Sequence, residues 1–166
     1  QDWMKAALTA RAAGLDPKSM RFVAFEGGGE AITALQGGHV QVYSGDASEA
    51  EEQIKAGAKI RVLAVLADKR LEGPMAKTPT MKELGYDVQW PIIRGFYMGP
   101  KVTDAGYKVG QSTCAKMMAT PEYDKLRTER SLFKFALTGK ELDTFIAERM
   151  TTYRTLAKDF GLKVAQ

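Results

Sequence analysis

Two short glycine-containing loops are the segments of this 166-residue chain whose residue types could bind a small anion. The first loop follows an apolar run, precedes a predicted helix, and consists of Gly27, Gly28 and Gly29. At such a position backbone N–H groups point outward, and the helix dipole favours a carboxylate or a phosphate. The loop is neither a Walker motif nor a GxGxxG motif. A tight strand-to-helix turn that needs a flexible backbone is therefore the alternative interpretation.

The second loop follows the next predicted strand and consists of Ser44, Gly45 and Asp46. Open α/β sheets bind ligands at the carboxyl ends of their strands, so we expect both loops to converge on one sheet edge. An ordinary helix N-cap is the alternative for this loop. Arg94, on a predicted hinge, is the third candidate. It could pair with a ligand carboxylate through two hydrogen bonds, or tie two domains together.

The remaining reactive residues are too few to build a catalytic or metal centre. His39 is the only histidine and Cys114 the only cysteine, which excludes a zinc cluster and makes a Ser-His-Asp or Cys-His arrangement depend on His39 alone. We interpret His39 as a surface or turn residue and Cys114 as a packed helix residue. Three acids, at 49, 51 and 52, are interpreted as a solvated helix face. The sequence thus predicts no catalytic residue, no metal site and no cofactor.

The elements that must position these loops alternate between strands and helices. Hydrophobic periodicity predicts helices over 2–13, 30–36 and 46–54, and strands over 20–25, 39–43 and 60–67. This order implies parallel pairing with right-handed crossovers. Short strands are expected at 88–90 and 95–98, on either side of the hinge.

From residue 103 onward the sequence predicts mostly helix. Thr120 followed by Pro121 is a typical helix start, and Thr138 with Glu141 predicts the capped start of a helix that continues to Phe160. Thr80 with Glu83 predicts a similar cap. The long final helix has an apolar face over about five turns that needs a partner surface. We therefore expect the isolated chain to form a homodimer or a swapped assembly.

Composition and charge narrow the class of protein. Hydrophobic residues make up 45% of the chain and charged residues 27%, as in a folded domain rather than a disordered one. The net charge is +4, and all of the excess lies in 98–166, where 12 basic residues accompany 8 acidic ones. Because these basic residues are spread singly among acids, nucleic-acid binding is not expected. No apolar run is long enough for a membrane-spanning helix.

Several segments, in order along most of the chain, resemble one known family. The segments 25–31 and 34–40 read FEGGGEA and ALQGGHV and are similar to the GGGEA and ALLGGHV signature of the tripartite tricarboxylate transporter receptors, also called Bug-type substrate-binding proteins. The similarity continues through QIKAG at 53–57, LAV at 63–65, TPT at 78–80 and ELGYDV at 83–88. Arg94-Gly95, Gly99-Pro100 and Gly161-Leu162 also fit the family pattern.

The resemblance implies an α/β protein with a periplasmic-binding-protein-like two-domain fold around a ligand cleft. Residues 1–95 would form the second α/β domain, without its first strand and loop. Residues 96–166 would supply the crossing segment and the C-terminal helical part of the first domain. The chain begins inside a predicted helix at Gln1 and has no signal segment, so we expect it to be a shortened or processed form.

The implied function is an extracytoplasmic receptor that captures a small carboxylate in the periplasm and delivers it to membrane transporter subunits. Its ligand-binding residues would be those of the two loops and Arg94. A ligand-sensing module that signals to a partner protein is the first alternative. An α/β enzyme that uses His39 is the second.

Overall fold

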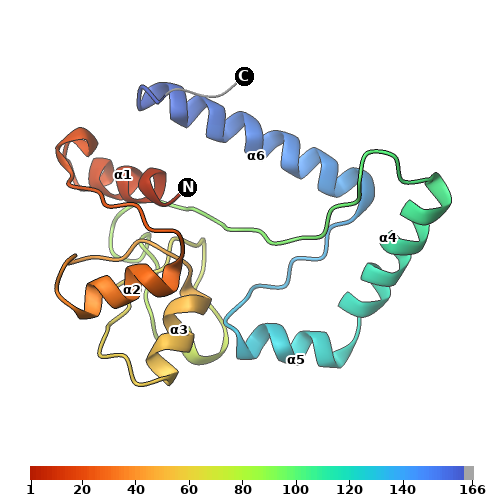
Figure 1. Ribbon diagram of the computed structural model, residues 1–166, viewed down its shortest axis with the longest axis horizontal. Coiled ribbons are helices and arrows are strands. Elements are labelled where there is room, and N and C mark those ends of the chain that lie inside the picture. The colour runs from red at the N-terminus through yellow and green to blue at the C-terminus, as the bar shows by residue number, and fades with distance from the viewer. Residues whose placement is uncertain (163–166) are drawn as a thin grey trace. The chain divides into compact units, whose positions relative to one another are not determined.

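The computed structural model describes residues 1–162, and these contain six α-helices (Figure 1). The helices are α1 (Asp2–Ala12), α2 (Gly28–Gln36), α3 (Ala47–Lys55), α4 (Asp104–Met118), α5 (Pro121–Glu129) and α6 (Gly139–Asp159). Two short 3-10 helices, η1 (Pro17–Ser19) and η2 (Gly73–Met75), lie in the connections. The helices predicted around the two glycine loops are therefore present, within one or two residues of their predicted ends.

The chain forms two compact units. The first consists of Gln1–Ile93 with Leu126–Phe133, and the second of Arg94–Lys125 with the residues from Lys134 onward. The division passes through α5, because the last residues of this helix belong to the first unit. The assignment of 1–95 and 96–166 to two receptor domains remains a prediction.

The predicted α/β class is wrong, because residues 1–162 contain no β-strand. The five segments predicted as strands run without regular secondary structure apart from one parallel bridge between Val65 and Thr80. Val65 donates its N–H to the Pro79 carbonyl at 2.9 Å and accepts from the Met81 N–H at 3.0 Å. A strand needs such bonds to repeat along a partner, and here they do not extend into a ladder. The apolar composition of these segments predicted that they are buried. Whether a segment forms a strand also depends on a partner segment that is distant in the sequence.

The core of the first unit is small and lies beneath α3. Val65, Leu71 and Met75 form a buried cluster, against which Ala47 of α3 and Phe133 pack. Phe133 belongs to the segment 126–133, which is part of the first unit. In that segment the buried Arg127 donates to Glu72 at 2.8 Å. The core therefore fixes α3 and, through it, the loop that precedes α3.

The helices of the second unit have few buried residues. Helix α4 has none, and α6 buries Ala157 within its bounds. Thr120 caps α5 by accepting from the Tyr123 N–H at 3.2 Å, as predicted. Thr138 is the N-cap of α6, but its side chain forms no capping hydrogen bond. Two aromatic side chains of this unit, Phe96 and Tyr97, are 84% and 83% exposed. The homodimer or swapped assembly remains a prediction.

The capping bonds predicted for Thr80 and Glu83 are present, although the segment is a turn rather than a helix. Thr80 N–H donates to Glu83 at 2.8 Å, and Glu83 N–H donates to Thr80 Oγ1 at 3.1 Å. The hydrogen bond from the Thr80 backbone, helped by Arg70, lowers the pKa of the Glu83 carboxyl. Because the charged form is favoured in the folded state, Glu83 stabilises the fold above its unfolded pKa.

Glu83→Gln is therefore expected to lower the thermal unfolding midpoint at pH 7. The difference from the unchanged chain should shrink as the pH falls through the depressed pKa of Glu83, because the carboxylate is then protonated in both states. Thermal unfolding between pH 7 and pH 3 measures this. Asp87→Asn, which removes a nearby exposed carboxylate, is the control. A Glu83→Gln effect independent of pH would contradict the assignment.

Candidate functional site

The triple-glycine loop forms the N-terminus of α2. Gly27 is the N-cap residue in an extended conformation, and Gly28 and Gly29 are the first two residues of the helix. The cap has no side-chain hydrogen bond, since glycine offers none. Farther along, Ile32 is fully buried and anchors α2, which packs on α3. The loop is thus held by its helix, and nothing lies within 4 Å of a Cβ added at Gly27 or Gly29.

The second loop forms the N-terminus of α3. Asp46 is the N-cap residue, but its side chain makes no capping hydrogen bond. Its carboxylate lies 3.8 Å from the ammonium of Lys5, a residue of α1. Lys5 is only 3% exposed, and its ammonium also pairs with Asp2 at 2.7 Å. The buried cation of Lys5 is therefore shared between two carboxylates, of which Asp2 is the closer.

Tyr43 joins the two loops. A Cβ added to Gly45 would overlap the Tyr43 ring, so the ring lies directly on this glycine. A Cβ added to Gly28 would lie 2.5 Å from the Tyr43 hydroxyl and 2.7 Å from Cδ of Glu49. Glycine is therefore required at 28 and 45 for Tyr43 to lie this close to both loops, and the two loops meet at this side chain. The sheet edge on which the loops were expected to converge is absent from residues 1–162, and their contact is made by Tyr43 instead.

A carboxylate lies at this junction. The Tyr43 hydroxyl donates to Glu49 Oε2 at 2.7 Å, and Glu49 is a half-buried residue of α3. Burial, together with the hydrogen bond and the negative charge of Glu49, raises the pKa of the Tyr43 phenol far above its ordinary value. Tyr43 consequently stays protonated, and remains a hydrogen-bond donor, across the physiological pH range.

Sequence reasoning missed three residues of this cluster: Lys5, Tyr43 and Glu49. Lys5 lies in the helix predicted over 2–13, where apolar periodicity gives no signal for a buried lysine. Tyr43 lies at the end of the strand predicted over 39–43. The interpretation of the α3 acids as a solvated face is wrong for Glu51, which is 3% exposed and paired with Lys55. Tyr43 directly precedes the second loop, and that proximity was the available signal.

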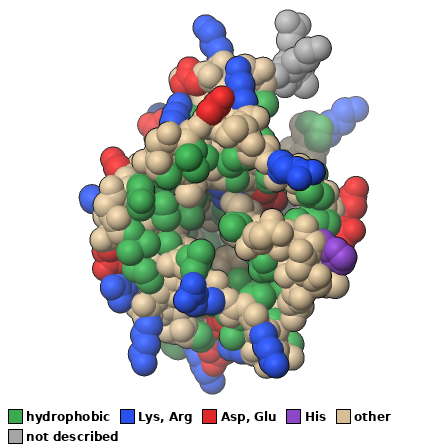
Figure 2. All heavy atoms as spheres, turned by 90° about the vertical axis from the view of Figure 1, so that its left-hand side faces the viewer, with side chains coloured by type: hydrophobic (Ala, Val, Ile, Leu, Met, Phe, Trp, Pro, Cys, Tyr) green, Lys and Arg blue, Asp and Glu red, His purple; other side chains and the backbone are tan. Residues whose placement is uncertain are grey.

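The other predicted residues do not join the cluster. Arg94 is exposed and begins the second unit. His39 lies at the surface, where Figure 2 shows it as the single purple side chain. Within residues 1–162, no group of three His, Cys, Asp or Glu side chains is arranged to hold a metal ion. Cys114 is a half-buried free thiol on α4.

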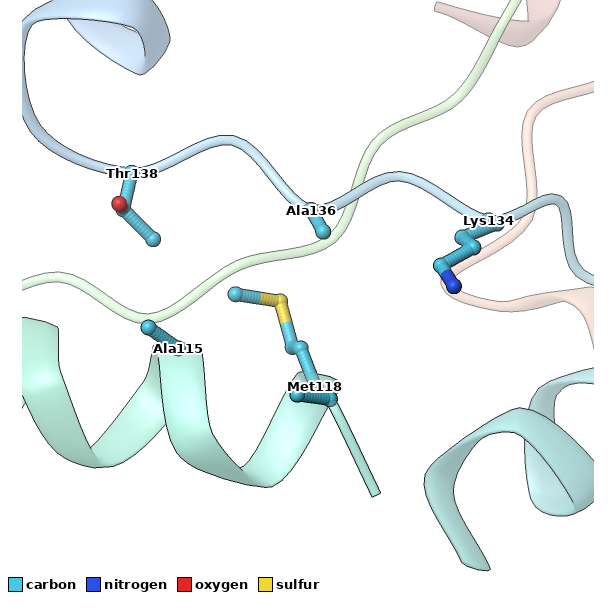
Figure 3. A pocket seen from close by; sticks show the side chains of 6 residues that line it. Ala115, Met118, Lys134, Ala136 and Thr138 are labelled. Atoms are coloured by element: carbon cyan, nitrogen blue, oxygen red, sulfur yellow. The ribbon is translucent and has the colours of Figure 1, made fainter. Parts of the chain in front are cut away.

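A separate cavity of about 240 Å³ lies in the second unit, between α4 and the segment 134–138. Figure 3 shows the Met118 side chain directed from α4 toward Ala136, with Lys134 and Thr138 along the same segment. Ala115 and Ala119 complete the lining. None of the predicted ligand-binding residues contributes to it.

Comparison with known families decides the class of protein. The model of the tripartite tricarboxylate transporter family receptor matches residues 6–162. The chain belongs to this family. Comparisons with curated proteins and with solved structures return no match. The resemblance noted from the glycine motifs is thereby confirmed.

Family membership settles several points about this receptor. It is a solute-binding receptor for a tripartite tricarboxylate transporter and not an enzyme, so the alternative of an enzyme that uses His39 is wrong. The family works with membrane subunits of the transporter and indicates an extracytoplasmic location. No helix within residues 1–162 has the length and apolar character needed to cross a membrane.

Proposed function

We propose that this receptor captures a small carboxylate in the periplasm and delivers it to the membrane subunits of its transporter. The observation that carries the proposal is the junction of two glycine loops at the N-termini of α2 and α3. Helix N-termini attract anions through their dipoles and their first N–H groups. In this proposal Gly27, Gly28 and Gly29, with Ser44, Gly45 and Asp46, present those groups to the ligand.

The assignment of chain segments to receptor domains is part of the same proposal. Residues 1–95 correspond to one ligand-binding domain, and residues 96–166 to a crossing segment and the C-terminal helices of the other. Arg94 is then the basic residue at the crossing, available to pair with a ligand carboxylate through its planar guanidinium. Capture involves closure around the ligand, with no bond made or broken.

Thermal unfolding with a panel of small acids tests this function. The panel contains succinate, citrate, glutamate and benzoate, each compared with sodium chloride at equal ionic strength. A ligand at 100 times its Kd adds about 2.7 kcal/mol, which raises the midpoint of a chain of this size by roughly 5–10 °C. Diamide and ester analogues without charge should produce no shift. If no acid raises the midpoint above the salt control, carboxylate capture by this chain is wrong.

A further inference from the structure

We propose that the second unit binds a second copy of this chain, and that Phe96 of each copy enters the other copy's cavity between α4 and the segment 134–138. Tyr97 then covers the rim of that cavity. The inference goes beyond the proposed function, because neither side of the contact includes a residue of the two glycine loops. The contact is also distinct from the apolar face of the final helix, from which the sequence predicts a homodimer.

The aromatic pair Phe96 and Tyr97 lies uncovered at the surface. The two side chains are 84% and 83% exposed, more than any other large hydrophobic side chain within residues 1–162. The next residue, Met98, is 48% exposed and extends the same apolar surface. Single apolar residues at a surface are ordinary, but contiguous apolar patches mark interaction sites. The aromatic pair is therefore one side of a candidate interface.

The segment that carries the aromatic pair is held on α4. A Cβ added to Gly110 of α4 would overlap the terminal methyl of Met98, so Met98 packs directly on this glycine. Glycines flank the pair at 95 and 99, and a Cβ added to either would have nothing within 4 Å. Met98 thus fixes the segment on its own unit, while the two rings stay accessible to another molecule.

The cavity in the same unit has room for an aromatic ring. Its volume is about 240 Å³, and the side chains of Ala115, Ala119 and Ala136 leave this space open. A cavity of about 150 Å³ is enough to bind benzene. Figure 3 shows Met118 directed from α4 toward Ala136 across the cavity. The chain's own Phe96 does not line it, so the space is available to the same residue of a second copy.

The other lining groups favour an aromatic occupant. Met118 brings a thioether sulfur to the cavity, and Lys134 brings an ammonium group. Sulfur makes favourable contacts with the edges of aromatic rings. An ammonium within about 6 Å of a ring centroid is attracted to the face of the ring. An aliphatic side chain would gain burial alone, whereas Phe96 would gain burial and both of these contacts.

A second copy of the chain is the partner that carries the matching group. The aromatic pair and the cavity belong to the same unit, so every copy both supplies a ring and offers a cavity. A two-fold axis between two copies forms both contacts at once, and two-fold dimers are the commonest soluble oligomers. This self-complementarity favours a second copy over a different protein.

Sedimentation velocity of the 166-residue chain, from low micromolar to near-millimolar concentration, tests the inference. The unchanged chain should associate reversibly, and Phe96→Ser should raise the Kd at least about tenfold, as truncation of a central aromatic side chain does. Val109→Ser is the matched control, because it removes a side chain that is 67% exposed on α4 outside the cavity. It should change the Kd less than twofold.

Filling the cavity should weaken association as strongly as Phe96→Ser. Ala115→Leu and Ala136→Leu both place a larger side chain in the space that the ring would enter. Both alanines are exposed, and they lie on different segments, so a folding defect of one variant does not decide the result. Ala105→Leu, an exposed position of α4 outside the cavity, is the control and should leave the Kd unchanged.

A mixture of two variants separates this contact from general adhesion between apolar surfaces. Phe96→Ser keeps the cavity and Ala115→Leu keeps Phe96, so the mixture can form one of the two contacts, whereas neither variant can form any alone. The mixture should therefore associate more tightly than either variant, and less tightly than the unchanged chain. The inference is overturned if the unchanged chain is monomeric at every concentration, if Phe96→Ser matches Val109→Ser, or if mixing restores no association.

Discussion

Ile32→Ala is expected to destabilise the first unit by about 2–5 kcal/mol, the range for removing a large aliphatic side chain from a packed interior. Ile32 is fully buried on α2, one helical turn after the glycine loop, and α2 packs on α3. Truncation leaves a cavity between elements that present the two loops. Loss of stability should therefore be accompanied by loss of the fixed geometry of the two glycine loops.

Urea unfolding followed by tryptophan fluorescence measures this effect, because Trp3 and Trp90 both belong to the first unit. Ile54→Ala on α3 is the matched control: the same atoms are removed from a side chain that is 37% exposed. It should cost less than Ile32→Ala, about 1–2 kcal/mol, because the partly exposed side chain buries less apolar area and leaves no enclosed cavity. Equal losses from the two variants would show that α2 is not packed as described.

Gly73→Ala is expected to have the second large effect. Gly73 begins η2 with φ +69°, in the left-handed region that costs other residues roughly 1–2 kcal/mol. An added Cβ would overlap the backbone carbonyl oxygen of Thr128 and lie 3.3 Å from its carbon. Backbone cannot swing aside as a side chain can, so overpacking adds roughly 1–3 kcal/mol. The total is therefore about 2–5 kcal/mol.

Gly57→Ala separates the two causes. Gly57 has φ +94° and nothing within 4 Å of an added Cβ, so its substitution carries the conformational cost alone. The difference between the two variants in urea unfolding should equal the cost of displacing Thr128. Because Thr128 belongs to the segment 126–133, Gly73→Ala should also increase protease cleavage in that segment. If the two variants lose the same stability, Thr128 does not lie against Gly73.

The helices around the site could be predicted from local sequence. Gly27 to Gly29 open α2, Asp46 precedes α3, and Thr120 caps α5, all of which follow from residue preferences within a few positions. The strands could not be predicted correctly, because a strand is completed by a partner distant in the chain. Alternating residues at 39–43 and an apolar run at 60–67 predicted buried strands. Of these residues, Val65 alone forms a β-bridge, and its partner is Thr80.

In the candidate site, too, some features could be predicted from local sequence and others depend on tertiary packing. The two glycine loops could be found from their residue types, because glycine before a helix leaves the backbone accessible. Their connection through Tyr43 could not, since it depends on how α2 packs against α3. The periodicity of the first helix did not reveal the burial of Lys5. Asp2 is a local partner within α1, but the second acid near Lys5, Asp46, is distant in the chain and is brought close by the fold.

The sequence by itself determined the family of this receptor, its helices and the glycine loops that could receive a carboxylate. These features depend on residues close together in the sequence, because helix capping and the backbone freedom of glycine act over a few positions. Only the tertiary structure decided that the loops meet on Tyr43, that Lys5 lies near Asp46 as well as Asp2, and that the carboxylate of Glu49 lies against Gly28. Burial and charge pairing join residues far apart in the chain, and no local pattern encodes which pairs will form.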